Sequence, residues 1–79
     1  QLVTLMAWTE EAFLRFTEGS PIRRIGHERW LRNLAVAMGN ALHAGAGEAV
    51  GDAEIRASLL ARRSHPSALV REHVLWALS

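Results

Sequence analysis

Four arginines within ten consecutive residues are the side chains of this sequence best suited to binding chemistry. A guanidinium group binds a phosphate or carboxylate through two parallel hydrogen bonds, which a lysine ammonium cannot form. Segment 20–43 sets these four charges against the single acid Glu28, a net charge of +3. The pattern indicates contact with a phosphate backbone, to which Ser20 and loop amides add hydrogen bonds and Trp30 adds a ring for stacking on a base. The four residues, called the arginine patch below, are Arg23, Arg24, Arg29 and Arg32.

The same residues also fit a purely structural role. Glu28 and Arg32 are four residues apart, a spacing at which opposite charges pair along a helix surface. In that interpretation Trp30 packs in the core, and the other arginines are solvated or cap the ends of neighbouring helices. The residues alone leave both interpretations open.

Other kinds of site find little support in the 79-residue sequence. It has no cysteine, which excludes from this segment disulfides, thiolate metal ligands, a cysteine nucleophile and iron–sulfur ligation. The four histidines stand on separate segments without HxH or HxxxH spacing, so we expect no metal ligand, cofactor-binding residue or catalytic residue here. No apolar run approaches the roughly 18 residues of a membrane span, so no membrane partner is expected.

The elements that must hold the arginine patch are predicted to be helices. Thr9 and the two acids after it mark a helix from about residue 10 to 16 or 17. The longest helix is expected from 26 or 27 to about 42, after a segment 21–25 that is left undecided, and a loop follows over 43–47. Asp52 is expected to cap a third helix over about 53–63, with a start as early as 48 left open, and a fourth runs from 67 or 68 to the end. The expected core residues are Leu31, Leu34, Met38, Leu59, Leu60, Val70 and Val74.

A weak internal repeat indicates how the helices are arranged. Leu31-Arg32 corresponds to Val70-Arg71 at an offset of 39 residues, and Ala37-Met38 to Ala77-Leu78 at an offset of 40. A period near 40 residues with two helices per unit is typical of HEAT repeats. We therefore expect an all-α fold: one HEAT-like helical domain over residues 1–79, with four main helices in antiparallel pairs, as the C-terminal fragment of a longer protein.

Two blocks of the sequence carry a resemblance to a known family. Ser20-Pro21-Ile22-Arg23-Arg24-Ile25-Gly26, followed by Trp30-Leu31-Arg32-Asn33-Leu34-Ala35-Val36-Ala37-Met38-Gly39-Asn40, resembles the C-terminal region of the epoxyqueuosine reductase family. The closing block from Val70 to Leu78 is similar to the final HEAT-like helix of that family. The similarity runs from about Trp8 to the end of the chain.

The resemblance implies far more than this segment contains. It implies a cytoplasmic bacterial enzyme that removes the epoxide oxygen of epoxyqueuosine in a tRNA anticodon and so completes queuosine biosynthesis. Its two [4Fe–4S] clusters and its cobalamin are held by upstream catalytic and ferredoxin-like domains. The HEAT-like segment itself is implied to be non-catalytic and to help grip the tRNA, with the arginine patch as the contact.

The sequence departs from the common HEAT pattern at one position. HEAT units often have an aspartate where His65 stands, paired with the arginine of the following helix, which here is Arg71. The alternative function is a HEAT-like protein-interaction or structural cap without a nucleic-acid role, its arginines docked on acidic residues of the same protein.

Overall fold

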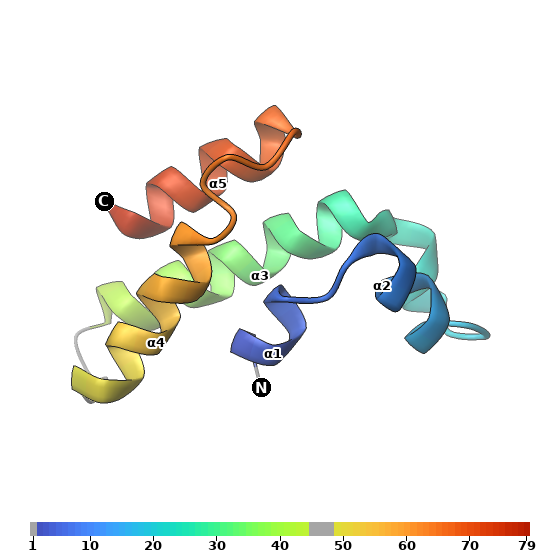
Figure 1. Ribbon diagram of the computed structural model, residues 1–79, viewed down its shortest axis with the longest axis horizontal. Coiled ribbons are helices and arrows are strands. Elements are labelled where there is room, and N and C mark those ends of the chain that lie inside the picture. Colours follow the sequence, from blue (N-terminus) through green and yellow to red (C-terminus); the bar gives the residue numbers. More distant parts are fainter. Residues whose placement is uncertain (1, 45–48) are drawn as a thin grey trace.

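The computed structural model describes residues 2–44 and 49–79, and every regular element in those ranges is a helix (Figure 1). The prediction of an all-α fold is therefore confirmed. No helix in the described ranges is both long and apolar enough to cross a membrane. In chain order the elements are α1 (Leu2–Met6), α2 (Glu10–Phe16), the 3₁₀ helix η1 (Pro21–Ile25), α3 (Gly26–His43), α4 (Ala49–Leu60) and α5 (Ala68–Leu78).

Short polar side chains fix the beginnings of three helices. The hydroxyl of Thr9 accepts a hydrogen bond from the Ala12 amide at 3.1 Å and caps α2, as its sequence predicts. The hydroxyl of Ser67 caps α5 in the same way, 3.2 Å from the amide of Val70. Ser20 caps η1, the segment that the sequence left undecided. The predicted bounds of α2 and α5 lie within about one residue of the observed bounds.

The remaining boundaries differ more. The helix α1 is not predicted at all, and α3 continues to His43, where a loop was expected. The rest of that expected loop falls mainly outside the described residues. Asp52 is not a cap, because α4 already begins at Ala49 and Asp52 lies in its first turn. That position still suits an acid, since the helix dipole is positive there.

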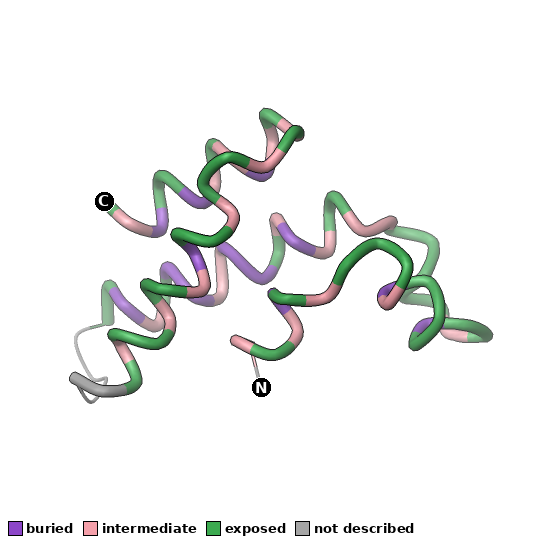
Figure 2. Tube along the Cα trace, viewed as in Figure 1, coloured by how far each residue is buried: buried purple, intermediate pink, exposed green. Residues whose placement is uncertain are grey.

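The helix α3 is the centre of the fold and contacts each of the other five elements (Figure 1). Its buried positions form a continuous apolar strip, against which α5 packs along most of its length (Figure 2). One core prediction is wrong: Leu60 is 49% exposed. Successive helical residues point about 100° apart, and Leu59, which is fully buried, takes the inward direction. The other predicted core residues are buried as expected: Leu31, Leu34, Met38, Leu59, Val70 and Val74.

The close approach of α3 and α5 depends on Gly39. A Cβ atom at this position would meet the ring of Trp76 and lie 3.0 Å from the Cα of Ala77. We expect Gly39→Ala to lower the free energy of unfolding by about 1–2 kcal/mol, because overpacking costs about 1–3 kcal/mol and the better helix propensity of alanine returns at most about 1 kcal/mol.

Gly51 in α4 provides the matched control, since nothing lies within 4 Å of a Cβ there. Gly51→Ala should raise the free energy of unfolding by up to about 1 kcal/mol. Thermal unfolding of both variants checks the opposite signs, and a stabilised Gly39→Ala variant would contradict the close contact.

Candidate nucleic-acid interface

The arginine patch spans the junction of η1 and α3. Arg23 and Arg24 lie in the last turn of η1, and Arg29 and Arg32 lie in the first two turns of α3. The first three are exposed, whereas Arg32 is half-buried, and its Nε donates a hydrogen bond to Oδ1 of Asn33 at 2.8 Å. Arg23, Arg24 and Arg29 are therefore the most accessible members of the patch, and Arg32 uses only its Nε in the hydrogen bond to Asn33.

The junction that carries the patch is built by local backbone preferences. Pro21 occupies the first position of η1, where its missing N–H costs nothing. Gly26 joins η1 to α3 with φ at 82°, a conformation that residues with a Cβ rarely adopt. No atom lies within 4 Å of a Cβ at Gly26, so glycine is needed there for its conformation and not for space.

Glu28 and Arg32 do not show the contacts that the structural interpretation expected. The Glu28 carboxylate accepts a hydrogen bond from the hydroxyl of Ser67, which also caps α5. Arg32 donates to Asn33. Glu28 therefore fastens the start of α3 to the start of α5 through a residue that is 39 positions away in the sequence.

Trp30 is part of an aromatic cluster and is poorly placed to stack on a base. Its ring stacks on Trp8, with centroids 5.7 Å apart and planes 16° apart, and it packs against Phe13 at 5.4 Å. Its indole Nε1 is buried and has no hydrogen-bond partner among the described residues. The core role of Trp30, one of the two open interpretations, is the one that these contacts favour.

The same cluster has an exposed end at Phe16, which the sequence analysis missed. The Phe16 ring lies 5.0 Å from the Trp8 ring, and 63% of the residue is exposed. It is the most exposed of the large hydrophobic residues that the structure describes. Its position at the end of a helix just before Thr17 gave no periodic signal for this exposure.

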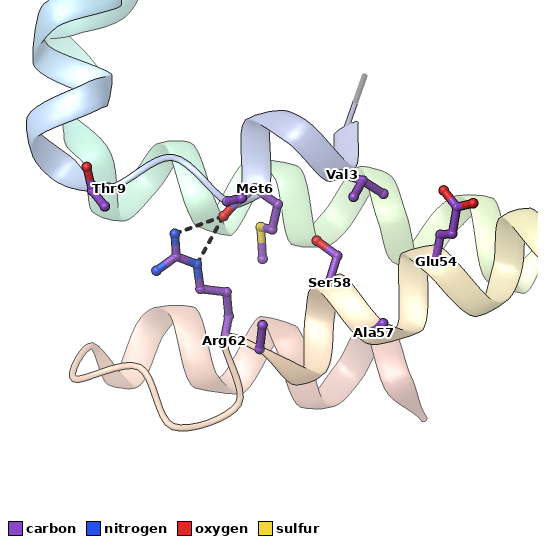
Figure 3. Close-up of a pocket in the computed structure, with 9 residues that line it drawn as sticks. Val3, Met6, Thr9, Glu54, Ala57, Ser58 and Arg62 are labelled. Atoms are coloured by element: carbon purple, nitrogen blue, oxygen red, sulfur yellow. Dashed lines mark hydrogen bonds between the residues drawn. The ribbon is translucent and has the colours of Figure 1, made fainter.

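A second group of polar residues fastens the N-terminal segment to the rest of the fold. Arg62 donates to the Met6 carbonyl from Nε at 3.0 Å and from Nη2 at 2.9 Å (Figure 3). Its Nη2 also donates to the Trp8 carbonyl at 2.8 Å. The Nε2 of His27 lies 2.8 Å from the same Trp8 carbonyl. Because a carbonyl can only accept, His27 carries its proton on Nε2. We call Arg62 and the carbonyls of Met6 and Trp8 the Arg62 clamp.

The clamp satisfies the carbonyls at the end of α1. The last carbonyls of a helix have no partner within it, and a cation beside them also suits the negative end of the helix dipole. Burial lowers the pKa of Arg62 from its ordinary value. No local pattern in the sequence around Arg62 indicates these acceptors, which lie 56 and 54 residues away.

The link between Arg71 and the segment before α5 survives without the aspartate of the common HEAT pattern. Arg71 Nη1 donates to the carbonyls of His65 and Pro66 at 2.7 and 2.8 Å, so two backbone oxygens take the place of a carboxylate. The Nδ1 of His65 accepts a hydrogen bond from the Ser67 amide at 3.0 Å. Burial, and then the charge of Arg62, lower the pKa of His65, which agrees with a neutral ring in this acceptor role.

The histidines come closer together in the fold than their spacing in the sequence indicates. The rings of His27 and His65 have centroids 6.5 Å apart, beside Arg62 and Glu28. Within residues 2–44 and 49–79, no three or more histidine, aspartate or glutamate side chains gather as a metal site would require. The sequence also has no cysteine that could hold a metal or cluster.

Over its whole length the chain is similar to bacterial epoxyqueuosine reductases. It is 64% identical over 81 residues to the epoxyqueuosine reductase of Alicycliphilus denitrificans, covering 100% of this chain and 22% of that protein. It is 54% identical over 78 residues to the protein of that name from Pseudomonas aeruginosa, covering 99% and 19%. For Escherichia coli the identity is 50% over 80 residues, covering 100% and 18%. No family model matches the chain, and no solved structure does.

The chain therefore spans about a fifth of the length of the curated relatives that it matches, and the matched part is their C-terminal region. The resemblance of the two sequence blocks to the C-terminal region of epoxyqueuosine reductases is therefore confirmed.

Proposed function

We propose that this chain, whose whole length matches the C-terminal region of epoxyqueuosine reductases, is the non-catalytic, tRNA-contacting module of such an enzyme. The similarity of 64% to 50% identity over essentially all residues is the observation that carries the proposal. The parent enzyme is cytoplasmic and reduces epoxyqueuosine to queuosine in the anticodon region of tRNA. Its two [4Fe–4S] clusters and cobalamin are held by upstream catalytic and ferredoxin-like domains, and residues 1–79 form a single HEAT-like domain beside them.

The module's own task in this proposal is electrostatic. Arg23, Arg24 and Arg29 are exposed at one junction of the fold, and guanidinium groups at such positions bind phosphate oxygens and release counterions. Phosphate contacts hold and orient the RNA without reading its sequence, so the chemistry stays with the upstream domains. At physiological salt the field of these charges extends about 8 Å, enough to act on a backbone at the surface.

A structural or protein-interaction role is the second candidate, and two observations favour it. Arg62 and Arg71 donate hydrogen bonds to backbone carbonyls of this same chain and so help to hold the fold together. A hollow of about 580 Å³ between α1 and α4 is also open on the surface, and Val3, Met6 and Ala57 are among the residues that line it (Figure 3). Such a hollow suits an apolar side chain from another part of the parent protein.

The change Arg29→Ala in the full-length enzyme separates the two functions. We expect it to weaken tRNA binding and to flatten the slope of log affinity against log salt by about 0.7–0.9, the contribution of one phosphate contact. Turnover at saturating tRNA should stay close to that of the unchanged enzyme, because in this proposal the catalytic groups belong to the upstream domains. Binding isotherms at several salt concentrations provide the measurement.

Arg56→Ala is the matched control, because Arg56 is also exposed but lies on α4, outside the arginine patch. It should leave the salt slope unchanged. An Arg29→Ala enzyme with an unchanged slope and a lower melting temperature would reject tRNA contact by this residue and favour the structural role.

A further inference from the structure

We propose that Phe16 is a stacking platform for an unpaired nucleobase of the RNA that the arginine patch holds. This inference rests on the proposed function, since it adds a base contact to a phosphate contact. It concerns a residue that neither the charge pattern nor the similarity to other proteins singles out.

The ring of Phe16 packs against another aromatic ring and is otherwise largely exposed to solvent. Trp8 covers one side, with centroids 5.0 Å apart and planes 31° apart, and Trp8 in turn stacks on Trp30. Phe13 packs against the far end of this series at 5.4 Å from Trp30 and is fully buried. The exposed ring is thus backed by rigid aromatic rings and not by mobile side chains, which lowers the entropy lost when a base stacks on it.

Phe16 also belongs to the end of the fold that carries the charges that would bring RNA to it (Figure 1). The Phe16 ring contacts the Trp8 ring, which stacks on Trp30. Trp30 directly follows Arg29 in α3. The helix α2 that ends at Phe16 contacts α3, and it lies at the same end of the fold as η1 (Figure 1). Aromatic rings next to arginines that track a backbone are the usual composition of surfaces that bind single-stranded nucleic acid.

An apolar protein surface could also pack against Phe16, so the experiment must distinguish a need for an aromatic ring from a need for apolar area. Leu14, Ile22 and Ile25 on α2 and η1 are also 39–45% exposed, and a docking domain would bury them together with Phe16. Such a partner requires apolar area, which leucine supplies as well as phenylalanine. A nucleobase requires a flat π face, which leucine lacks.

The experiment compares Phe16→Leu and Phe16→Trp in the full-length enzyme, with tRNA as the probe and Leu14→Ala as the control. We expect Phe16→Leu to weaken tRNA binding about tenfold and Phe16→Trp to preserve it, within the range that base stacking on an aromatic ring contributes. Neither change should alter the salt slope, because no charge is removed. Leu14→Ala should leave the affinity unchanged.

Two outcomes overturn the inference. If Phe16→Leu binds tRNA as well as the unchanged enzyme while Arg29→Ala still flattens the salt slope, the phosphate contact stands and the stacking contact does not exist. If Phe16→Leu and Phe16→Trp weaken binding equally and both lower the melting temperature of the enzyme, Phe16 is a packing residue. Failure of the proposed function itself is recognised separately, by the unchanged salt slope of Arg29→Ala.

Discussion

Leu34→Ala is expected to lower the free energy of unfolding of this chain by about 2–5 kcal/mol. Leu34 is only 7% exposed and lies in the apolar strip of α3 that α5 covers. Removing its side chain loses the transfer free energy of the buried carbons and leaves a cavity that the surrounding helices fill only in part. A domain of this size buries a small core, so the loss is a large fraction of its total stability.

Leu75→Ala is the matched control, because Leu75 is a leucine of the neighbouring helix α5 that is 56% exposed. It should change the stability by less than about 1 kcal/mol. Amide hydrogen exchange of α3 in the two variants measures the difference, since core amides exchange through global opening of the domain. Equal protection of α3 in the two variants would mean that Leu34 does not support the core.

Arg62→Ala is expected to cost about 2–3 kcal/mol. The change removes three hydrogen bonds from a charged group and leaves the Met6 carbonyl without the partner that the structure shows for it. The loss is smaller than three fully buried charged hydrogen bonds would give, because Arg62 is only partly buried and water can reach part of the site.

The loss should be concentrated at the N-terminal end. Hydrogen exchange of α1 and of the residues up to Trp8 should accelerate first, because the Arg62 clamp is what ties them to the end of α4. Arg63→Ala is the matched control, since Arg63 is the next arginine along the chain and is exposed. Equal exchange rates of α1 in the two variants would show that the clamp does not hold this segment.

The parts of the fold that could be predicted from the sequence are those that local chemistry decides. Thr9 is a side chain that accepts from the amide three residues on, so the start of α2 could be placed closely. The start of α5 could be placed closely because Pro66 suits the beginning of a helix. The repeating apolar positions of α3 identified its buried face. Leu60 was misplaced because its neighbour Leu59 is the same residue type, and only the direction of α4 in the fold decides which of the two is buried.

What could not be predicted depends on contacts between distant residues. The helix α1 is 5 residues long, has no side-chain cap described and is too short to be stable alone. It exists because Met6 is buried in the core and because Arg62 binds its last carbonyl. The meeting of His27 with the Trp8 carbonyl, like the exposed end of the aromatic cluster at Phe16, follows from the same packing and has no local signal.

In the candidate interface, too, some features could be predicted from the local sequence and others could not. The presence of the arginine patch at a helix entrance was predictable, because Pro21 and Gly26 determine the backbone on both sides of Arg23 and Arg24. Which arginines are free was not predictable, because Arg32 is engaged by its neighbour Asn33. The combined phosphate and base contact on this surface stays a prediction that the Arg29 and Phe16 variants test.

The Arg62 clamp also has a consequence for the order in which the domain folds. Its bonds join residues 54 and 56 positions apart, so the chain must close a long loop before the clamp can form, whereas helical turns within α3 need no such closure. We therefore expect the clamp to form late in folding, after α3 and α5 have come together. Contacts made that late slow the escape from the native state without speeding its formation. We expect Arg62 to lengthen the lifetime of the folded chain and to leave the time needed to reach the folded state unchanged.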